Sequence, residues 1–346
     1  MKKGLNRRDF LKYSIAASTI IAAGDKIIGS GKASAAAITE VDKVFIWVLA
    51  DNFYDTNILD AKVGKRFRSS SGKSMHAEHG LSYYIETVVN GKTSTCMFDF
   101  GLDPRGVLNN IALLGIDIGK SSAFSLSHGH WDHYTSAVSV LKENLPRIAP
   151  GTPFYVGQEA FARRYTVRPG STELTDLGQL NKLDLEALGV KVVESTNPRE
   201  IIPGAYYSGN IERVTPYEKV AANFKIKRGE NIEHDTFPGE QAVYFKVKGQ
   251  GLVVLTACSH CGIVNTVKQV QKNTGTNKIH AIIGGFHLIN AQTDRIQNTV
   301  ADIKAMKPDY IVPTHCTGFE AIVAFSQAIP SGFILNTAGT KYTFTA

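Results

Sequence analysis

The hydrophobic positions in the first part of the chain form short runs separated by polar segments. Continuous or alternating apolar residues predict strands over 44–50, 81–89, 94–99 and 123–126. The Asn90-Gly91 pair between two of these strands is typical of a tight hairpin turn. Apolar residues at helical spacing predict helices over 105–114 and 134–145, with Gly115 as the stop of the first. This half therefore reads as strands, helix, strand, loop and helix, which is one face of a layered α/β domain.

The same alternation returns near the carboxyl end of the chain. Strands are predicted over 242–247, 252–256, 279–283 and 310–313, with helices over 263–271 and 293–306. The polar range 60–78 is expected to be an exposed loop that could border the active site. The range 146–241 is expected to be a loop-rich insertion with short strands at 154–156, 190–193 and 205–207. It could carry substrate-recognition groups, or it could be a solvated covering segment.

Histidines stand where the apolar runs end. The strand over 123–126 leads into Ser127-His128-Gly129-His130-Trp131-Asp132-His133, and three later strands run into loops that contain His260, His287 and His315. In an open α/β arrangement, residues at the carboxyl ends of strands line the ligand crevice. All of these loops can therefore face one another.

The first of these loops has the composition of a metal site. Three histidines and an aspartate within six residues are more than packing would ask for, and imidazole and carboxylate favour zinc, iron or manganese over calcium. The spacing suits two adjacent ions. Ligand count then assigns one ion to His128, His130 and His260, and the other to Asp132, His133 and His315.

The remaining histidines are given other roles. His287 is expected to orient a ligand or contact substrate, although it could be a ligand or a packed core residue. His79, which opens the strand over 81–89, could contact substrate or hold backbone by a hydrogen bond. His76, His234 and His280 are treated as surface or packing residues.

Charge and composition limit the class of protein. The chain has 346 residues, 43% hydrophobic and 20% charged, with a net charge of +7. The first 35 residues carry +5 of this, and the +2 left for the remainder gives no case for nucleic-acid binding. Range 1–37 combines Arg7-Arg8-Asp9-Phe10-Leu11-Lys12, a short apolar stretch and small residues around 33–37, which resembles a twin-arginine export signal. We therefore expect recognition by the export machinery, a periplasmic or otherwise exported protein, and no stable membrane span after cleavage.

Four cysteines remain after the leader. Cys96 lies in an apolar run and is expected to be a buried thiol. Cys258 and Cys261 form a Cys-x-x-Cys around His260, where a disulfide is possible in an oxidising compartment, and Cys316 follows His315.

The motif His128-x-His130-x-Asp132-His133 after a hydrophobic strand resembles that of the metallo-β-lactamase superfamily. The resemblance implies an α/β (α+β) fold, an αββα sandwich of two mixed sheets flanked by helices, as a single domain over 38–346. Segments around the other histidines narrow it to the branch named for dihydropterin-aminobenzene phosphate synthase; they are Glu78-His79-Gly80-Leu81-Ser82, Leu255-Thr256-Ala257-Cys258-Ser259-His260, Ile283-Gly284-Gly285-Phe286-His287-Leu288 and Pro313-Thr314-His315-Cys316-Thr317-Gly318.

Three details depend on this resemblance. Many members of the superfamily carry a bridging aspartate where this chain has Thr256-Ala257-Cys258, so either Cys258 takes a ligand role or solvent alone bridges the ions. His234 lies roughly where other members keep a third metal histidine, but it ranks below His260. The branch resemblance also favours a place near the substrate for His79.

The expected chemistry is metal-assisted hydrolysis of a small-molecule ester, lactone, amide or phosphate at a mono- or dinuclear centre, with zinc as the favoured metal and iron or manganese as alternatives. Asp132 binds metal and orients water, and Asp132, His287 and His79 are the candidate catalytic residues. A pterin-directed condensing enzyme and an iron-dependent redox protein are the alternative functions. Export argues against the first of these, because pterin assembly uses cytoplasmic precursors.

Overall fold

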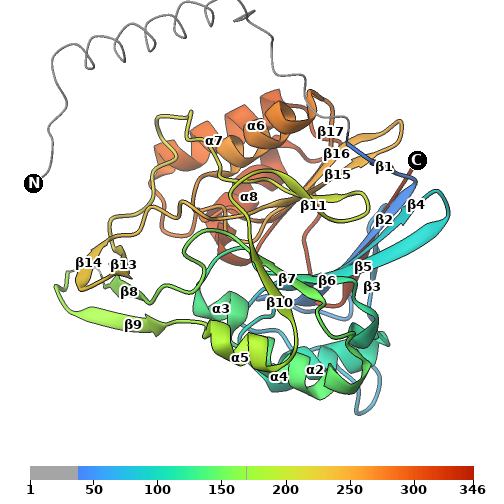
Figure 1. The fold of residues 1–346 in the computed structure, drawn as a ribbon. Helices are drawn as coiled ribbons and strands as arrows, with labels where there is room; N and C mark the ends of the chain where they lie inside the picture. The colour runs from blue at the N-terminus through green and yellow to red at the C-terminus, as the bar shows by residue number, and fades with distance from the viewer. Residues whose placement is uncertain (1–37, 169) are drawn as a thin grey trace, which may run out of the picture. The chain divides into compact units, whose positions relative to one another are not determined.

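A computed structural model describes residues 38–168 and 170–346. Its core is a pair of sheets that face each other, with helices on both outer faces (Figure 1). The αββα sandwich expected from the motif is therefore confirmed. The predicted export signal at 1–37 lies outside the described residues.

The first sheet has eight strands. In spatial order they are β10 (Lys191–Glu194), β7 (Pro153–Val156), β6 (Ala123–Ser125), β5 (Lys92–Phe98), β4 (Ser82–Val89), β2 (Lys43–Ala50), β19 (Thr340–Thr345) and β3 (Gly64–Arg66). The predicted hairpin is confirmed, since β4 and β5 pair antiparallel through to Val89 and Lys92 on either side of Asn90-Gly91. Strands β5, β6 and β7 run parallel, so their carboxyl ends lie along the same edge.

The second sheet has seven strands. They are β11 (Arg199–Ile202), β12 (Ala205–Tyr207), β15 (Val243–Val247), β16 (Gly251–Leu255), β17 (Ile279–Gly285) and β18 (Tyr310–Thr314), with β1 (Glu40–Val41) pairing with β15. Strands β16, β17 and β18 are parallel, as the predicted strand-helix alternation requires. Their carboxyl ends supply the second set of loops.

The outer layers are helical. They contain α2 (Pro104–Leu114), α3 (Trp131–Tyr134), α4 (Ala137–Asn144), α5 (Lys182–Ala187), α6 (Ile263–Thr274), α7 (Thr293–Ala305) and α8 (Phe319–Ala328), with 3-10 turns η1 (Ile118–Lys120), η2 (Leu145–Arg147) and η3 (His315–Thr317). Local sequence explains α2, because Asp103 caps its first turn, Pro104 opens it and Gly115 closes it in the left-handed conformation at φ 66°. No helix among the described residues is long and apolar enough to cross a bilayer.

Three hydrophobic layers hold these elements together. The layer between the sheets joins residues such as Phe98 of the first sheet and Ile283 of the second. A second layer packs α2 and α4 against the first sheet, and a third packs α6, α7 and α8 against the second. Because both faces of each central strand are covered, these strands are almost continuously apolar.

The range 146–241 is divided among three sheets and is not one insertion. Strands β7 and β10 belong to the first sheet, and β11 and β12 to the second. The rest builds a separate four-stranded sheet, which we call the accessory sheet, in the order β14 (Asn231–His234), β13 (Phe224–Arg228), β8 (Arg164–Val167) and β9 (Leu174–Gly178). Its strands are only four or five residues long and form two hairpins, β8–β9 and β13–β14, which pair with each other through β8 and β13. The composition of such short strands resembles that of loops.

The helix predicted over 134–145 also differs from the structure. It is split into α3 and α4, so Asp132 and His133 lie within the short first helix. The carbonyl oxygen of His133 accepts the backbone N–H of Phe100 at 2.7 Å and is not available to continue the helix. A contact between elements thus sets the helix boundary at the motif.

Candidate metal centre

Three histidines form the first candidate site. His128 and His130 lie between β6 and α3, and His260 lies between β16 and α6. The ring centroids are 4.7–4.9 Å apart, and one nitrogen from each ring lies within 4.8 Å of the others. The trio predicted from ligand count is therefore brought together.

The nitrogens of this trio fit a metal ion. Nε2 of His128, Nε2 of His130 and both ring nitrogens of His260 are buried without a hydrogen-bond partner among the described residues. Buried polar atoms without partners are costly, and a metal ion would satisfy them. Burial also lowers the pKa of all three histidines well below the usual range, which leaves them neutral with a free lone pair.

Asp132, His133 and His315 form the second candidate site. Oδ2 of Asp132 lies 3.5 Å from Nε2 of His133 and 3.3 Å from Nε2 of His315, and donor atoms of all three lie within 4.8 Å of one another. Burial alone would lower the pKa of His133, but the carboxylates of Asp132 and Asp99 raise it to about 10. The two carboxylates thus stabilise a positive charge on or beside the His133 ring.

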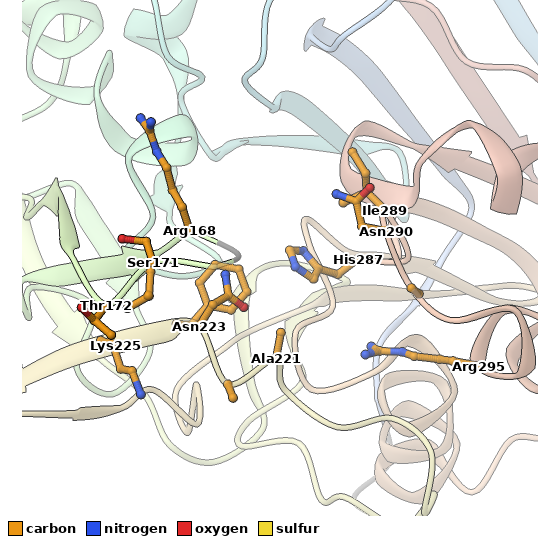
Figure 2. A pocket seen from close by; sticks show the side chains of 14 residues that line it. Arg168, Ser171, Thr172, Ala221, Asn223, Lys225, His287, Ile289, Asn290 and Arg295 are labelled. Atoms are coloured by element: carbon orange, nitrogen blue, oxygen red, sulfur yellow. The ribbon is translucent and has the colours of Figure 1, made fainter.

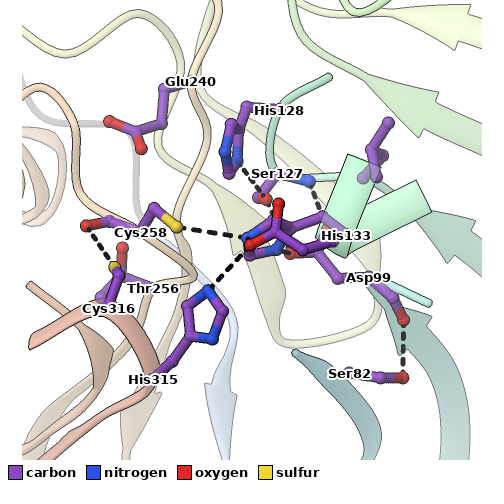
Figure 3. Close-up of polar contacts among 12 residues, drawn as sticks. Ser82, Asp99, Ser127, His128, His133, Glu240, Thr256, Cys258, His315 and Cys316 are labelled. Carbon is purple, nitrogen blue, oxygen red and sulfur yellow. Dashed lines mark hydrogen bonds and ion pairs between the residues drawn. The ribbon is translucent and has the colours of Figure 1, made fainter. Parts of the chain in front are cut away.

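Cys258 lies between the two sites, as Figure 3 shows. Its Sγ is 3.2 Å from Nε2 of His133. It can share an ion with His128 and His133, with His260 and His287, or with His315 and Cys316. All four cysteines are free and buried, so the permitted Cys258–Cys261 disulfide is not formed.

The two remaining predicted site residues line a cavity of about 350 Å³ beside these groups. His287 is half-buried, its Nδ1 has no partner among the described residues, and its ring is 4.2 Å from that of His260. His79 stacks on His315 with ring centroids 5.2 Å apart, and its Nε2 lies 3.6 Å from Oδ2 of Asp132. The side chain of His79 is 57% exposed, so it faces the open side of the cavity.

The accessory sheet closes one wall of this cavity. Thr166 of β8, Leu177 of β9 and Phe224 of β13 line it together with Trp131. Side chains of the range 146–241 thus border the candidate site.

The three other histidines lie outside both sites. His76 and His234 are exposed, and Nε2 of His234 contacts the carbonyl oxygen of Ala221 at 3.1 Å. His280 pairs through Nδ1 with Asp309 at 2.7 Å. No group of possible metal donors among the described residues includes any of them.

Known proteins are similar to this chain in sequence and in fold. The chain is 30% identical, over 300 residues, to the 7,8-dihydropterin-6-methyl-4-(β-D-ribofuranosyl)-aminobenzene-5'-phosphate synthase of Methanocaldococcus jannaschii. The aligned residues make up 86% of this chain and 95% of that protein. The solved structure of a metal-dependent hydrolase of the β-lactamase superfamily matches with a TM-score of 0.66 and 24% identity, over 88% of this chain and all of that one. The chain belongs to the metallo-β-lactamase superfamily. Within it, the chain lies in the branch of the dihydropterin-aminobenzene phosphate synthase.

A second relative from the same organism is an uncharacterized protein, 28% identical over 255 residues, which cover 74% of this chain and 90% of that protein. No family model matches the chain.

Several residues behind this superfamily site were not predicted from sequence. Asp99 ends β5, where its Oδ2 accepts from Nδ1 of His133 at 2.7 Å and from Oγ of Ser127 at 2.6 Å. Ser127 Oγ in turn lies 2.9 Å from Nδ1 of His128. Asp99 therefore orients one histidine from each site. The sequence feature that could have indicated this role is an acidic residue directly after an apolar strand.

Asp51 and Asn52 orient His315 in the same way. The Asp51 carboxylate accepts from the backbone N–H of His315 at 3.2 Å and from the hydroxyl of Thr314. Oδ1 of Asn52 lies 3.2 Å from Nδ1 of His315. Both residues directly follow β2.

Glu240 positions the loop of His260. Its two carboxylate oxygens accept the backbone N–H groups of His260 and Cys261, each at 2.7 Å. Burial raises the pKa of this fully enclosed carboxyl group. No motif marked it, because it acts on backbone from a distant segment.

Proposed function

We propose that this chain is a metal-dependent hydrolase that acts on a small-molecule ester, lactone, amide or phosphate. One observation carries the proposal: six buried donors form two sites, several with unpaired nitrogens, and three of them, His130, Asp132 and His315, line the cavity of about 350 Å³. The fold of a metal-dependent hydrolase of the superfamily supports it.

Each candidate site residue has a role in the proposed reaction. His128, His130 and His260 would hold one ion, while Asp132, His133 and His315 would hold the other. When bound, such ions lower the pKa of water and polarise the group under attack. Asp132 would also orient the attacking water, and the imidazoles of His79 and His287, which both line the cavity, would contact the substrate.

Metal analysis joined to a hydrolysis screen tests this function. We expect about two ions per chain and turnover of at least one ester, lactone or phosphodiester substrate. His128→Ala should lose metal and all turnover. His234→Ala removes an exposed histidine outside the sites and should keep both. A metal-free protein, or equal loss in both variants, would contradict the proposal.

We propose zinc as the metal, with Cys258 among its ligands. The thiol lies against His133 where other superfamily members keep a bridging aspartate, and thiolate ligands favour zinc. In cobalt-substituted protein, thiolate ligation should give a sulfur-to-metal absorption band in the near ultraviolet. Cys258→Ser should abolish this band, and Cys96→Ser, a buried thiol elsewhere in the core, should keep it. A band unaffected by Cys258→Ser would exclude the ligand role.

The second candidate function is a condensing reaction on a dihydropterin, of the kind that the name of the 30% identical relative describes. It would use the same site with an aromatic amine in place of water. Incubation of metal-loaded protein with a dihydropterin and an aminobenzene ribofuranosyl phosphate separates the two candidates. Formation of the joined product without ester or phosphate turnover would favour the synthase.

We also propose export through the twin-arginine pathway, on the basis of the sequence at 1–37. This pathway carries folded proteins, so a metal could be loaded before export. Replacing Arg7 and Arg8 by lysine should keep the protein in the cytoplasm in a fractionation experiment. An unchanged distribution would argue against this route.

A further inference from the structure

A second and larger cavity adjoins the candidate metal centre. Its volume is about 820 Å³, which is within the range of small-molecule sites. Phe224, His287 and Ile289 line both this cavity and the smaller one at the metal centre. A single ligand can therefore extend from the metal centre into the larger cavity.

The charged groups around this larger cavity are all positive. Arg168, Lys225 and Arg295 line it, and its lining contains no aspartate or glutamate. None of the three cations forms an ion pair among the described residues; the neighbouring Arg163, Arg164, Lys227 and Arg228 all do. Neutral donors at Ser171, Thr172, Asn223 and Asn290 complete the lining.

Arg295 is the best placed of the three cations. Figure 2 shows its side chain extending from α7 toward the cavity, whereas Arg168 and Lys225 lie on the accessory-sheet side. Its Nε is buried without a hydrogen-bond partner, and a terminal guanidinium nitrogen donates to the carbonyl oxygen of Lys219 at 2.9 Å. Because guanidinium groups bind carboxylates and phosphates through charge-assisted hydrogen bonds, Arg295 can contact an anion in this cavity.

No carboxylate among the described residues forms an ion pair with the Arg295 guanidinium, although Asp294 of the same helical turn accepts its backbone N–H at 2.7 Å. Glu218 acts on the guanidinium electrostatically, but the Glu218 carboxylate already accepts the backbone N–H groups of Val264 and Asn265 and the hydroxyl of Thr215. Arg295 also lies in the first turn of the thirteen-residue helix α7, whose N-cap residue Gln292 makes no side-chain cap. The positive end of the helix dipole adds to the charge of the guanidinium.

We propose that this cavity, with Arg295 as its anchor, binds an anionic group of the substrate, a phosphate or a carboxylate, while the reacting bond lies at the metal centre. The inference rests on the proposed function, because the cavity serves the same site. It narrows the substrate class to molecules that carry an anion away from the reacting group. Arg168 and Lys225 attract this anion from the accessory-sheet side, and His287 stands between the two cavities.

Calorimetric titration of the metal-loaded protein with inorganic phosphate and, separately, with acetate tests this site. Arg295→Gln should weaken binding of the preferred anion about tenfold, the size expected for loss of one charge-assisted contact. Arg163→Gln removes the same charge from an exposed arginine that pairs with Asp176 outside the cavity, so binding should stay within about twofold. Stronger binding of phosphate identifies a phosphate-bearing substrate, and stronger binding of acetate a carboxylate-bearing one.

The outcomes separate this site from the metal centre. Equal binding in wild type and Arg295→Gln would place the anion at the metal alone and overturn the proposal, as would no binding of either anion. Lys225→Gln, on the exposed strand β13, gives a second test with a smaller expected loss of about threefold. Because the readout is binding, absence of turnover would contradict the hydrolase proposal without deciding the anion site. Metal content must stay constant across the variants.

Discussion

At the scale of single residues, the candidate centre is a set of buried side chains that lack partners of their own. The imidazoles of His128, His130 and His260 are neutral, enclosed and largely without hydrogen bonds at the nitrogens that face one another. Such an arrangement is unfavourable by itself, since each unpaired buried group costs about 1–3 kcal/mol. Metal binding would remove this cost, which is why the arrangement indicates a ligand site more strongly than the histidine count does.

Asp99 gives a prediction at this scale. Asp99→Asn removes the carboxylate that orients His133 and, through Ser127, His128. We expect metal affinity to fall about 10- to 100-fold, measured by competition with a chromophoric chelator. Asp309→Asn is the matched control, because Asp309 also contacts a histidine Nδ1 at 2.7 Å but outside the metal donors. Equal affinities for the two variants would remove Asp99 from the site.

At the scale of elements, parallel strands bring the loops together. In the first sheet, Asp99 follows β5 and the His128 loop follows β6. In the second sheet, the His260 loop follows β16, the loop of His287 follows β17 and His315 follows β18. The accessory sheet is held against this edge by Arg164 of β8. Its guanidinium pairs with Asp235 at 2.7 Å and approaches the carbonyl oxygen of Gly129 at 3.4 Å.

Two adjacent arginines allow a test of that attachment. Arg164 and Asp235 are buried, whereas Arg163 and Asp176 form an exposed pair. Arg164→Met leaves Asp235 as an unpaired buried charge and should lower the free energy of unfolding by about 3–5 kcal/mol. Arg163→Gln should cost less than about 1 kcal/mol. Urea unfolding checks both values, and a similar small loss in the two variants would show that the buried pair does not hold the sheet.

At the scale of the whole molecule, the two halves of the chain meet at the candidate centre. Each site takes residues from both halves: His128 and His130 with His260, and Asp132 and His133 with His315. The same halves are also joined by the apolar layer between the sheets and by the pairing of β1 with β15 and of β19 with β2. A bound ion would therefore link the two halves and favour the folded chain.

Chelation tests this link. Bound metal at about 100 times its Kd stabilises a fold by about 2.7 kcal/mol. For a chain of this size, its removal should lower the melting temperature by roughly 4 °C. The same chelator should leave the melting temperature of His128→Ala nearly unchanged, because that variant lacks the complete site. An unchanged melting temperature in the wild-type protein would mean that the halves are held without metal.

Particular residues show how far sequence reasoning reached. The strands and helices of both halves, the hairpin at Asn90-Gly91 and both sets of metal donors follow from local pattern and from histidines at strand ends, and the structure brings those donors together. The accessory sheet was missed because its strands are only four or five residues long and its two hairpins pair through β8 and β13, which lie far apart in the sequence. Asp99, Asp51 and Glu240 were missed because each acts through a contact with a distant loop.

The sequence by itself determined the candidate metal donors and the order of the strands that carry them, because apolar periodicity and ligand chemistry are local properties. Only the tertiary structure decided which distant side chains orient these donors, where the helix at His133 breaks and which basic residues share a cavity with the centre. These features depend on contacts between segments far apart along the chain, and a linear pattern of residues does not encode such distances.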